Sequence, residues 1–120
     1  MIYPILICTA GRTDKCPAIT DLRDAGVPVT LFVEPHEAAA YKRVAGSKAE
    51  IVILPERDKG LAYTRNAALR HAVEKGFDWY WMIDDDLARW YEIVKKKAIQ
   101  IPITTALEKA QDLFPKRADV

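Results

Sequence analysis

The sequence has no apolar run long enough to cross a membrane and no large excess of either charge, since its formal net charge is +1. A membrane-spanning helix needs about 20 consecutive apolar residues, and residues 1–4 carry no basic residue of the kind that begins a signal peptide. We therefore expect a cytoplasmic protein without membrane contact. The 18 Lys and Arg residues are balanced by 17 Asp and Glu residues. A charged ligand must therefore be bound by individually placed side chains and not by bulk charge.

Cysteine and histidine are scarce, with two of each in the chain. Cys8 and Cys16 form no CxxC pair, and His36 and His71 lie far from them in sequence, so a structural zinc site is not expected. We expect free thiols, as in a reducing compartment, and histidines that lie at the surface or are satisfied by neighbours. The chain also lacks the GxGxxG and GxxxxGK[ST] motifs, which excludes a dinucleotide fingerprint and a Walker loop.

Half of the 120 residues are hydrophobic, enough to form the core of one domain. Short apolar runs typical of buried strands alternate with longer amphipathic segments typical of helices. Proline at the start of the first such helix and glycine at the end of the last one mark helix boundaries. The predicted strands are residues 4–8, 27–33, 51–54 and 77–83, and the predicted helices are residues 17–25, 37–44 and 61–75.

Regular alternation of strand and helix predicts parallel strand pairing with helices on both faces of the sheet. The fold class expected is therefore α/β, with a Rossmann-like, mostly parallel sheet. In such sheets ligands bind beyond the carboxyl ends of the strands. The polar segments of this chain fall at those ends, which predicts one functional edge.

Residues 87–120 are predicted to form a mainly helical tail on a core of residues 1–86, within one domain. The expected elements are a helix over residues 87–97, a short extended piece at residues 101–103 and a helix over residues 105–114. The basic run at residues 95–97 would be a solvated helix end. Several apolar residues of the tail are expected to lack cover, which predicts a homo-oligomer or a partner chain. They are Ile99, Ile101, Ile103, Leu107 and Leu113.

Three consecutive acids, Asp84, Asp85 and Asp86, follow the fourth predicted strand. Carboxylates two residues apart at a strand end can bind a hard divalent cation that completes its shell with phosphate oxygens. That arrangement would suit a nucleotide diphosphate. The alternative is an acidic helix N-terminus, in which Asp86 caps a helix that begins near Leu87.

Two further segments reach the same edge. Gly11 and Arg12 follow the first strand, where glycine lets the backbone approach a ligand and arginine can face a phosphate or stack on a base; a tight turn with an exposed arginine would explain them equally well. Arg65 and Asn66 lie one turn into the third helix, and could also be a solvent-facing pair. The aromatic residues 79–81 are expected in the core.

Together these segments resemble the nucleotide-sugar-binding half of GT-A glycosyltransferases. The resemblance is carried by Thr9-Ala10-Gly11-Arg12, by Glu34 at the end of the second strand, by residues 60–68 (GLAYTRNAA) and by residues 81–86 (WMIDDD). The closer likeness is to the phage and bacterial glycosyltransferases associated with TET/JBP-type oxygenases, thought to glycosylate hydroxymethylated pyrimidines in DNA. It covers roughly residues 1–114.

The resemblance implies a role for each matching residue. Ala10, Gly11 and Arg12 would line the base or ribose pocket, and Glu34 would contact the nucleoside. The remaining matches concern the phosphates, the sugar and the metal. Asp58 and Arg65 would lie near the base and phosphates, and Asp84 would contact ribose or sugar. Asn66 and Asp85 would also belong to the substrate-binding residues, and Asp84 and Asp86 would bind Mn²⁺ or Mg²⁺. The implied partners are a nucleotide sugar, a UDP-sugar first, and a nucleic-acid acceptor.

The family pattern also includes a second half with the acceptor site and usually a catalytic carboxylate, for which residues 87–120 offer no match. We therefore expect either a truncated or split enzyme, or a donor-binding remnant completed by another chain. A noncatalytic nucleotide-binding or assembly module with the same scaffold is the alternative. A sugar nucleotidyltransferase is disfavoured, because no glycine-rich basic loop follows the first strand.

Overall fold

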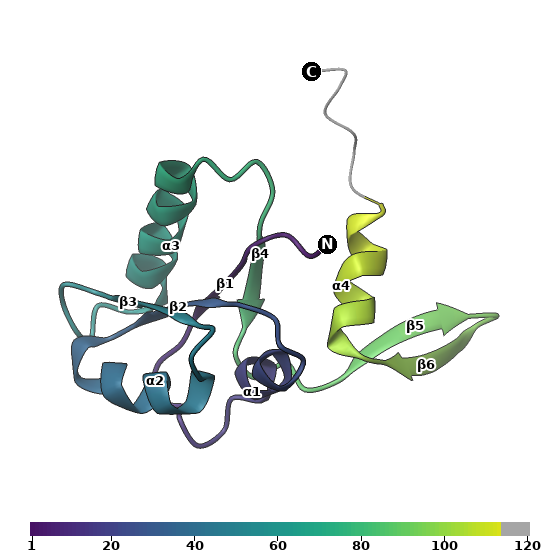
Figure 1. Cartoon of the computed structure of the whole chain (residues 1–120), viewed down its shortest axis with the longest axis horizontal. Coiled ribbons are helices and arrows are strands. Elements are labelled where there is room, and N and C mark those ends of the chain that lie inside the picture. Colours follow the sequence, from purple (N-terminus) through teal and green to yellow (C-terminus); the bar gives the residue numbers. More distant parts are fainter. Residues whose placement is uncertain (114–120) are drawn as a thin grey trace. The chain divides into compact units, whose positions relative to one another are not determined.

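The structure, a computed structural model, describes residues 1–113. It divides into two compact units (Figure 1). The α/β unit runs from Tyr3 to Ala88, and the second unit combines Met1–Ile2 with the chain from Arg89 onward.

A four-stranded parallel sheet forms the centre of the α/β unit. Its strands are β1 (Ile5–Cys8), β2 (Thr30–Val33), β3 (Glu50–Ile53) and β4 (Trp81–Asp84), in the order β3-β2-β1-β4. Leu6 pairs with Thr30 on one side and with Met82 on the other. The predicted α/β class with a parallel, Rossmann-like sheet is confirmed.

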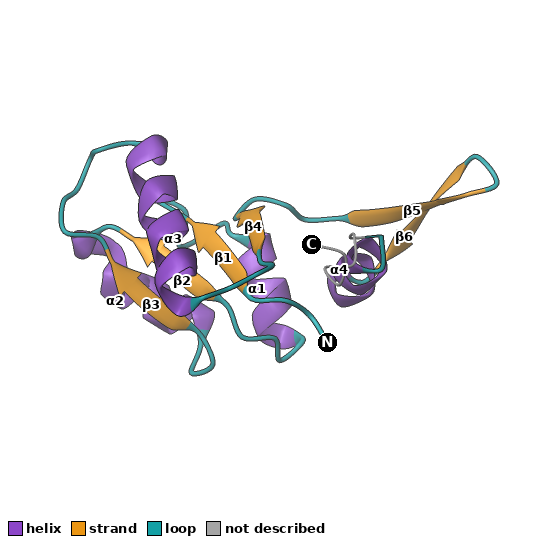
Figure 2. Ribbon diagram, turned by 90° about the horizontal axis from the view of Figure 1, so that it is seen from above, coloured by secondary structure: helices purple, strands orange, loops and turns teal. Residues whose placement is uncertain are grey.

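Helices cover both faces of this sheet (Figure 2). One face carries α3 (Leu61–Lys75), and the other carries α1 (Pro17–Asp24) and α2 (Ala38–Ala45), which follows a short 3-10 turn, η1 (Pro35–Glu37). Under α3, small side chains allow the helix to approach the sheet closely. This cluster consists of Leu6, Phe32, Leu54, Ala68 and Ala72, all buried.

The helix boundaries follow the local signals. Pro17 occupies the first turn of α1, where its missing N–H costs nothing. Gly76 caps α3 with φ 72° in the left-handed region, as glycine at this position favours. The predicted helix 37–44 is one residue out of place. The predicted strand 77–83 was too long, since β4 begins only at Trp81 and residues 77–80 form the approach to it.

The second unit contains the main correction to the sequence analysis. The helix predicted for residues 87–97 is wrong. β5 (Trp90–Val94) pairs antiparallel with β6 (Lys97–Ile101), and Lys95 and Lys96 form the turn between them, not the end of a helix. Aromatic and β-branched side chains at residues 90–94 favour a strand, and this preference outweighed the helical spacing.

Helix α4 (Ile103–Gln111) follows β6 through Pro102, whose extended backbone ends the strand. The predicted helix 105–114 is confirmed in substance, although Phe114 lies outside the described residues. Of the tail residues expected to lack cover, Ile103 and Leu107 are buried, whereas Ile99 and Leu113 are exposed. No helix within residues 1–113 is long and apolar enough to span a membrane.

Candidate nucleotide-sugar site

The order of the strands creates a natural crevice between β1 and β4. The chain passes outward from β1 to β2 and β3, then returns through α3 to place β4 on the other side of β1. Because β1 and β4 are neighbouring parallel strands, the segments that follow them leave the sheet at the same edge. In open α/β sheets such a switch in strand order is where ligands bind, beyond the carboxyl ends of the strands.

A cleft of about 310 Å³ lies at this position. It collects residues from the end of β1, from the first turns of α3 and from the end of β4. Five of the eight lining residues are charged, and six were predicted from the sequence as site residues. The lining consists of Cys8, Ala10, Arg12, Leu61, Arg65, Asp84, Asp85 and Asp86.

Asp85 differs from its two acidic neighbours because it is buried, with 7% of its surface exposed. Its carboxylate accepts a hydrogen bond from the Thr9 hydroxyl, and the same Thr9 oxygen lies 2.8 Å from the hydroxyl of Tyr41. The Thr9 hydroxyl has a single proton, which it donates in the hydrogen bond to the Asp85 carboxylate. The Tyr41 hydroxyl must therefore donate its own proton to the Thr9 oxygen. Tyr41 in turn accepts the backbone N–H of Arg12 at 3.0 Å. This chain of bonds fixes the loop after β1 to the end of β4.

Burial raises the pKa of the Tyr41 phenol, which keeps it protonated as a donor in this chain of bonds. Tyr41 is fully buried on α2. Nothing in the local sequence pattern distinguishes Tyr41 from an ordinary core aromatic residue, so it was not predicted as a site residue.

The other two acids, Asp84 and Asp86, line the cleft with exposed side chains. Asp84 and Asp86 are about two-thirds and one-half exposed, and each has an arginine nearby. The Arg65 guanidinium lies 3.6 Å from Asp84, and that of Arg12 lies 4.0 Å from Asp86 and 3.7 Å from Asp85. At these distances the pairs are loose and solvated, so each is worth little and is readily exchanged for a ligand.

Gly11 is held by a residue that the sequence analysis did not select. Its backbone N–H donates to both carboxylate oxygens of Glu37, at 3.0 and 2.8 Å. Its φ of 67° lies in the left-handed region, and no other atom would contact a side chain there. Glycine is therefore required by the backbone conformation and not by close packing.

Glu34 and Asp58 meet at the same edge of the sheet, outside the lining of the cleft. Glu34 follows β2, and its carboxylate accepts the backbone N–H of Asp58 at 2.9 Å. Asp58 itself adopts φ 60°, and its side chain pairs with Arg57 at 3.1 Å. The bond from Glu34 therefore fixes the loop before α3.

Cys8, at the end of β1, is the partly buried thiol among the residues that line the cleft. Burial raises the pKa of its thiol from 9.0 to about 11, an effect that Arg65 opposes and Asp84 reinforces. Cys8 and Cys16 are both free thiols, as predicted, and Cys16 directly precedes α1. A neutral Cys8 adds no charge to the cleft at physiological pH.

Asn66 lies exposed on α3 and does not line the cleft, because one residue along a helix turns the side chain by about 100° from that of Arg65. Trp79, Tyr80 and Trp81 are all partly buried, closer to the core position predicted for them than to a ligand platform.

The alternative reading of the acidic triplet as a helix N-terminus is excluded. No helix follows Asp86; residues 87–89 are irregular and lead into β5. Within residues 1–113 no group of three or more His, Cys, Asp or Glu residues converges to hold a metal ion. Asp84 and Asp86 therefore suit a hard divalent cation only if phosphate and water oxygens complete its shell.

Comparison with known proteins identifies the family of this chain. Searches of the curated proteins and of the solved structures found no match. The family model described as TET-Associated Glycosyltransferase matches residues 3–119, almost the whole chain. The chain therefore belongs to the TET-Associated Glycosyltransferase family.

Proposed function

We propose that this chain binds a nucleotide-sugar donor, a UDP-sugar first, in the cleft between β1 and β4, with Mn²⁺ or Mg²⁺ held by Asp84 and Asp86. The observation that carries the proposal is the convergence of two arginines and three aspartates from three separate elements on one cleft. A glycosyltransferase family implies such a donor.

The charges of the cleft support a diphosphate bound together with a cation. Three carboxylates outnumber two guanidiniums, so the cleft alone repels a free diphosphate. Once Asp84 and Asp86 hold a divalent cation, Arg12 and Arg65 are left to face phosphate oxygens, which a planar guanidinium binds well. We therefore expect metal and nucleotide to bind cooperatively and each alone to bind weakly.

The surrounding residues would position the nucleoside. Ala10 and Gly11 present backbone close to the cleft, and Gly11 is held in place by Glu37. Glu34 and the loop that contains Asp58 lie at the same edge of the sheet and would contact the base. Asp85, engaged with Thr9, would act mainly by orienting Arg12.

A bound divalent cation stabilises the negative charge that develops on a departing nucleoside diphosphate. The residues of this chain would contribute binding and orientation: Arg12 and Arg65 hold the phosphates in place, and Asp84 contacts the ribose or sugar. For the acceptor we propose a modified base in DNA, as the resemblance described above implies.

Isothermal titration calorimetry of UDP with and without Mn²⁺ tests this proposal. We expect binding in the presence of Mn²⁺ and at least tenfold weaker binding without it, a difference of about 1.4 kcal/mol or more. Asp86→Asn should weaken binding in Mn²⁺ by a similar factor, because it removes one anionic ligand without changing the shape of the side chain.

Asp21→Asn provides the matched control, since Asp21 is an exposed aspartate on α1 and lies outside the cleft. Its affinity for UDP should equal that of the parent chain. Equal UDP affinity with and without Mn²⁺, or equal effects of the two substitutions, would contradict the metal site.

A further inference from the structure

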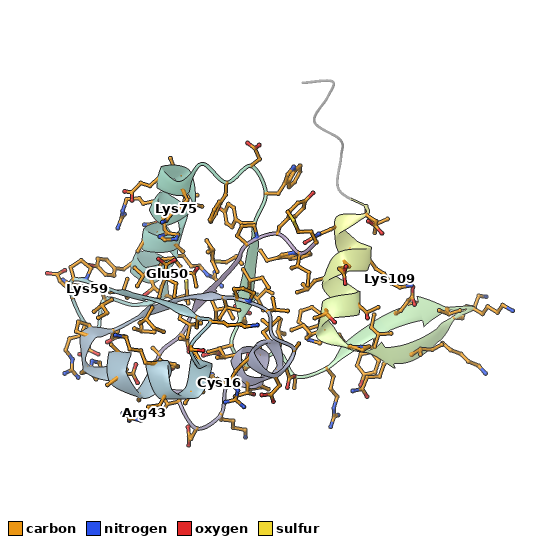
Figure 3. The ribbon with its side chains drawn as sticks, in the orientation of Figure 1. Cys16, Arg43, Glu50, Lys59, Lys75 and Lys109 are labelled. Atoms are coloured by element: carbon orange, nitrogen blue, oxygen red, sulfur yellow. The ribbon has the colours of Figure 1, made fainter. Side chains whose placement is uncertain are left out.

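The β5–β6 hairpin is unusual in how little of it is buried. Tyr91, Ile93 and Ile99 expose 52%, 70% and 49% of their surfaces. Cross-strand partners share a face of an antiparallel ribbon, so Tyr91 lies beside Gln100 and Ile93 beside Ala98. The opposite face includes Glu92, whose carboxylate accepts a hydrogen bond from Lys109 of α4 at 2.8 Å. Lys109 is labelled in Figure 3. Tyr91, near the base of the ribbon, also lines a hollow with Ala106 and Lys109 of α4. The base of the ribbon therefore lies against α4, whereas Ile93 and Ala98 near the tip are exposed.

The turn of the hairpin contains lysine at two positions where the backbone conformation favours asparagine or glycine. Lys95 and Lys96 are the two central residues, and both have positive φ, 49° and 66°. Two-residue turns with both φ values positive strongly prefer Asn-Gly, because lysine is strained in this region. Two lysines at these positions make the turn less stable than Asn-Gly would. A side-chain choice that breaks a local rule without a structural gain is expected at functional positions.

The positive charge at the tip is not neutralised. Lys95, Lys96 and Lys97 are consecutive and exposed, and no acidic side chain in the described part of the chain lies within ion-pair distance of them. Glu92, the acid of the ribbon, is already paired with Lys109. The tip of the hairpin therefore presents three consecutive lysines that form no ion pair within the described residues.

We propose that the β5–β6 hairpin is a nucleic-acid-binding ribbon, in which Lys95, Lys96 and Lys97 contact backbone phosphates and the exposed tip that carries Ile93 and Ala98 lies against the nucleic acid. A two-stranded ribbon fits the major groove of B-DNA, and phosphate contacts by lysine dominate the affinity of such interfaces. The inference rests on the proposed function only in expecting a nucleic-acid acceptor; the hairpin's charge and exposure support it independently.

The arrangement of charges argues against insertion into a membrane. A hairpin that enters a bilayer needs an apolar tip, because burying a charge in hydrocarbon is costly. Here the apolar side chains lie along the strands, and the three charges gather at the tip. A row of phosphates on one backbone is the partner that this pattern fits.

The test is the double variant Lys95→Asn with Lys96→Gly in the full chain. Asn and Gly suit the positive φ values, so thermal unfolding should occur at the same temperature as in the parent chain or higher. Binding to a fluorescent 20-base-pair DNA duplex, measured by anisotropy at low salt, should weaken at least fivefold. The slope of log affinity against log salt should fall by about two, or about 0.9 for each lost phosphate contact.

Lys42→Gln with Lys75→Gln is the control, since it removes two exposed lysines from helices of the α/β unit. This variant should bind the duplex within twofold of the parent chain. Equal losses in both double variants would show that only net charge matters and would overturn the proposal. Unchanged affinity in the hairpin variant would overturn it as well.

Two further measurements distinguish nucleic-acid binding by the hairpin from binding of another anionic partner and from the function of the donor site. Tighter binding to phosphatidylserine vesicles or to polyglutamate than to the duplex would assign the ribbon to another partner and refute a nucleic-acid role. UDP and Mn²⁺ calorimetry on the same preparations reports the donor site alone. Duplex binding that depends on the hairpin, without any UDP binding, would refute the proposed function and support nucleic-acid binding by the hairpin. UDP binding in Mn²⁺ without duplex binding that depends on the hairpin would support the proposed function and refute the hairpin proposal.

Discussion

The α/β unit and the second unit use their apolar residues in opposite ways. β1 lies between two other strands with helices on both faces, and Ile5, Leu6 and Ile7 are at most 2% exposed. In the hairpin, Tyr91 and Ile93 of β5 expose more than half of their surfaces. Burial of apolar surface is the main source of stability, so the α/β unit should determine whether the chain folds. The hairpin's exposed side chains are available for contacts with a partner.

The most severe test of this comparison is a pair of truncations. Phe32→Ala removes a fully buried ring that packs in the cluster under α3, and should lower the free energy of unfolding by about 3–5 kcal/mol. Ile93→Ala removes a side chain that is 70% exposed and should change it by less than about 0.5 kcal/mol. Urea unfolding followed by circular dichroism measures both.

Similar losses of stability in the two variants would break the comparison, because they would mean that Ile93 is buried in solution. A native Phe32→Ala protein with little loss of stability would instead show that α3 does not depend on the sheet for its stability.

Within the cleft, the same reasoning separates Asp85 from Asp86. Asp85→Ala leaves the Thr9 hydroxyl without its acceptor beneath the loop and should cost about 1–3 kcal/mol of stability. Asp86→Ala removes an exposed carboxylate with a loose arginine partner and should cost less than about 0.5 kcal/mol. Chemical denaturation of the two variants without nucleotide or metal gives the comparison.

The two aspartates should thus exchange rank between assays, Asp85 dominating stability and Asp86 dominating UDP binding in Mn²⁺. If Asp85→Ala is as stable as the parent chain, the buried network with Thr9 and Tyr41 does not hold the loop. Thr9→Val offers an independent check, since it removes the same hydrogen bonds while nearly keeping the volume of the side chain.

The sequence indicated most of the α/β unit because its signals are local. Each strand is a short apolar run, and Pro17 and Gly76 mark helix ends wherever they occur. The order of the strands was not predictable from such signals, because pairing between parallel strands is decided by contacts distant in sequence. The switch between β1 and β4, which creates the cleft, therefore emerged only from the structure.

The hairpin was missed for a complementary reason. Its turn contains Lys95 and Lys96 in place of the glycine or asparagine that normally identifies a two-residue turn. The site shows the same division between local and distant information. Arg12, Arg65 and the acidic triplet could be placed at strand and helix ends, whereas Glu37 and Tyr41 act through contacts with the distant loop after β1.

Alkaline pH should produce the smallest of these effects on stability. It tests the burial of side chains in the α/β unit, which contains two thiols and a phenol with raised pKa values. Burial raises the pKa of Cys8 from 9.0 to about 11 and also raises those of Cys16 and Tyr41. Below pH 9 the Cys8 thiol is protonated in both the folded and the unfolded chain, and its contribution to stability is fully present. Between pH 9 and 11 the unfolded chain loses this proton first, so stability falls as the pH rises. We expect the urea midpoint to decrease from pH 8 to pH 10, and to decrease less in Cys8→Ala. Parallel pH profiles for the parent chain and Cys8→Ala would mean that the Cys8 thiol is in contact with water in the folded protein.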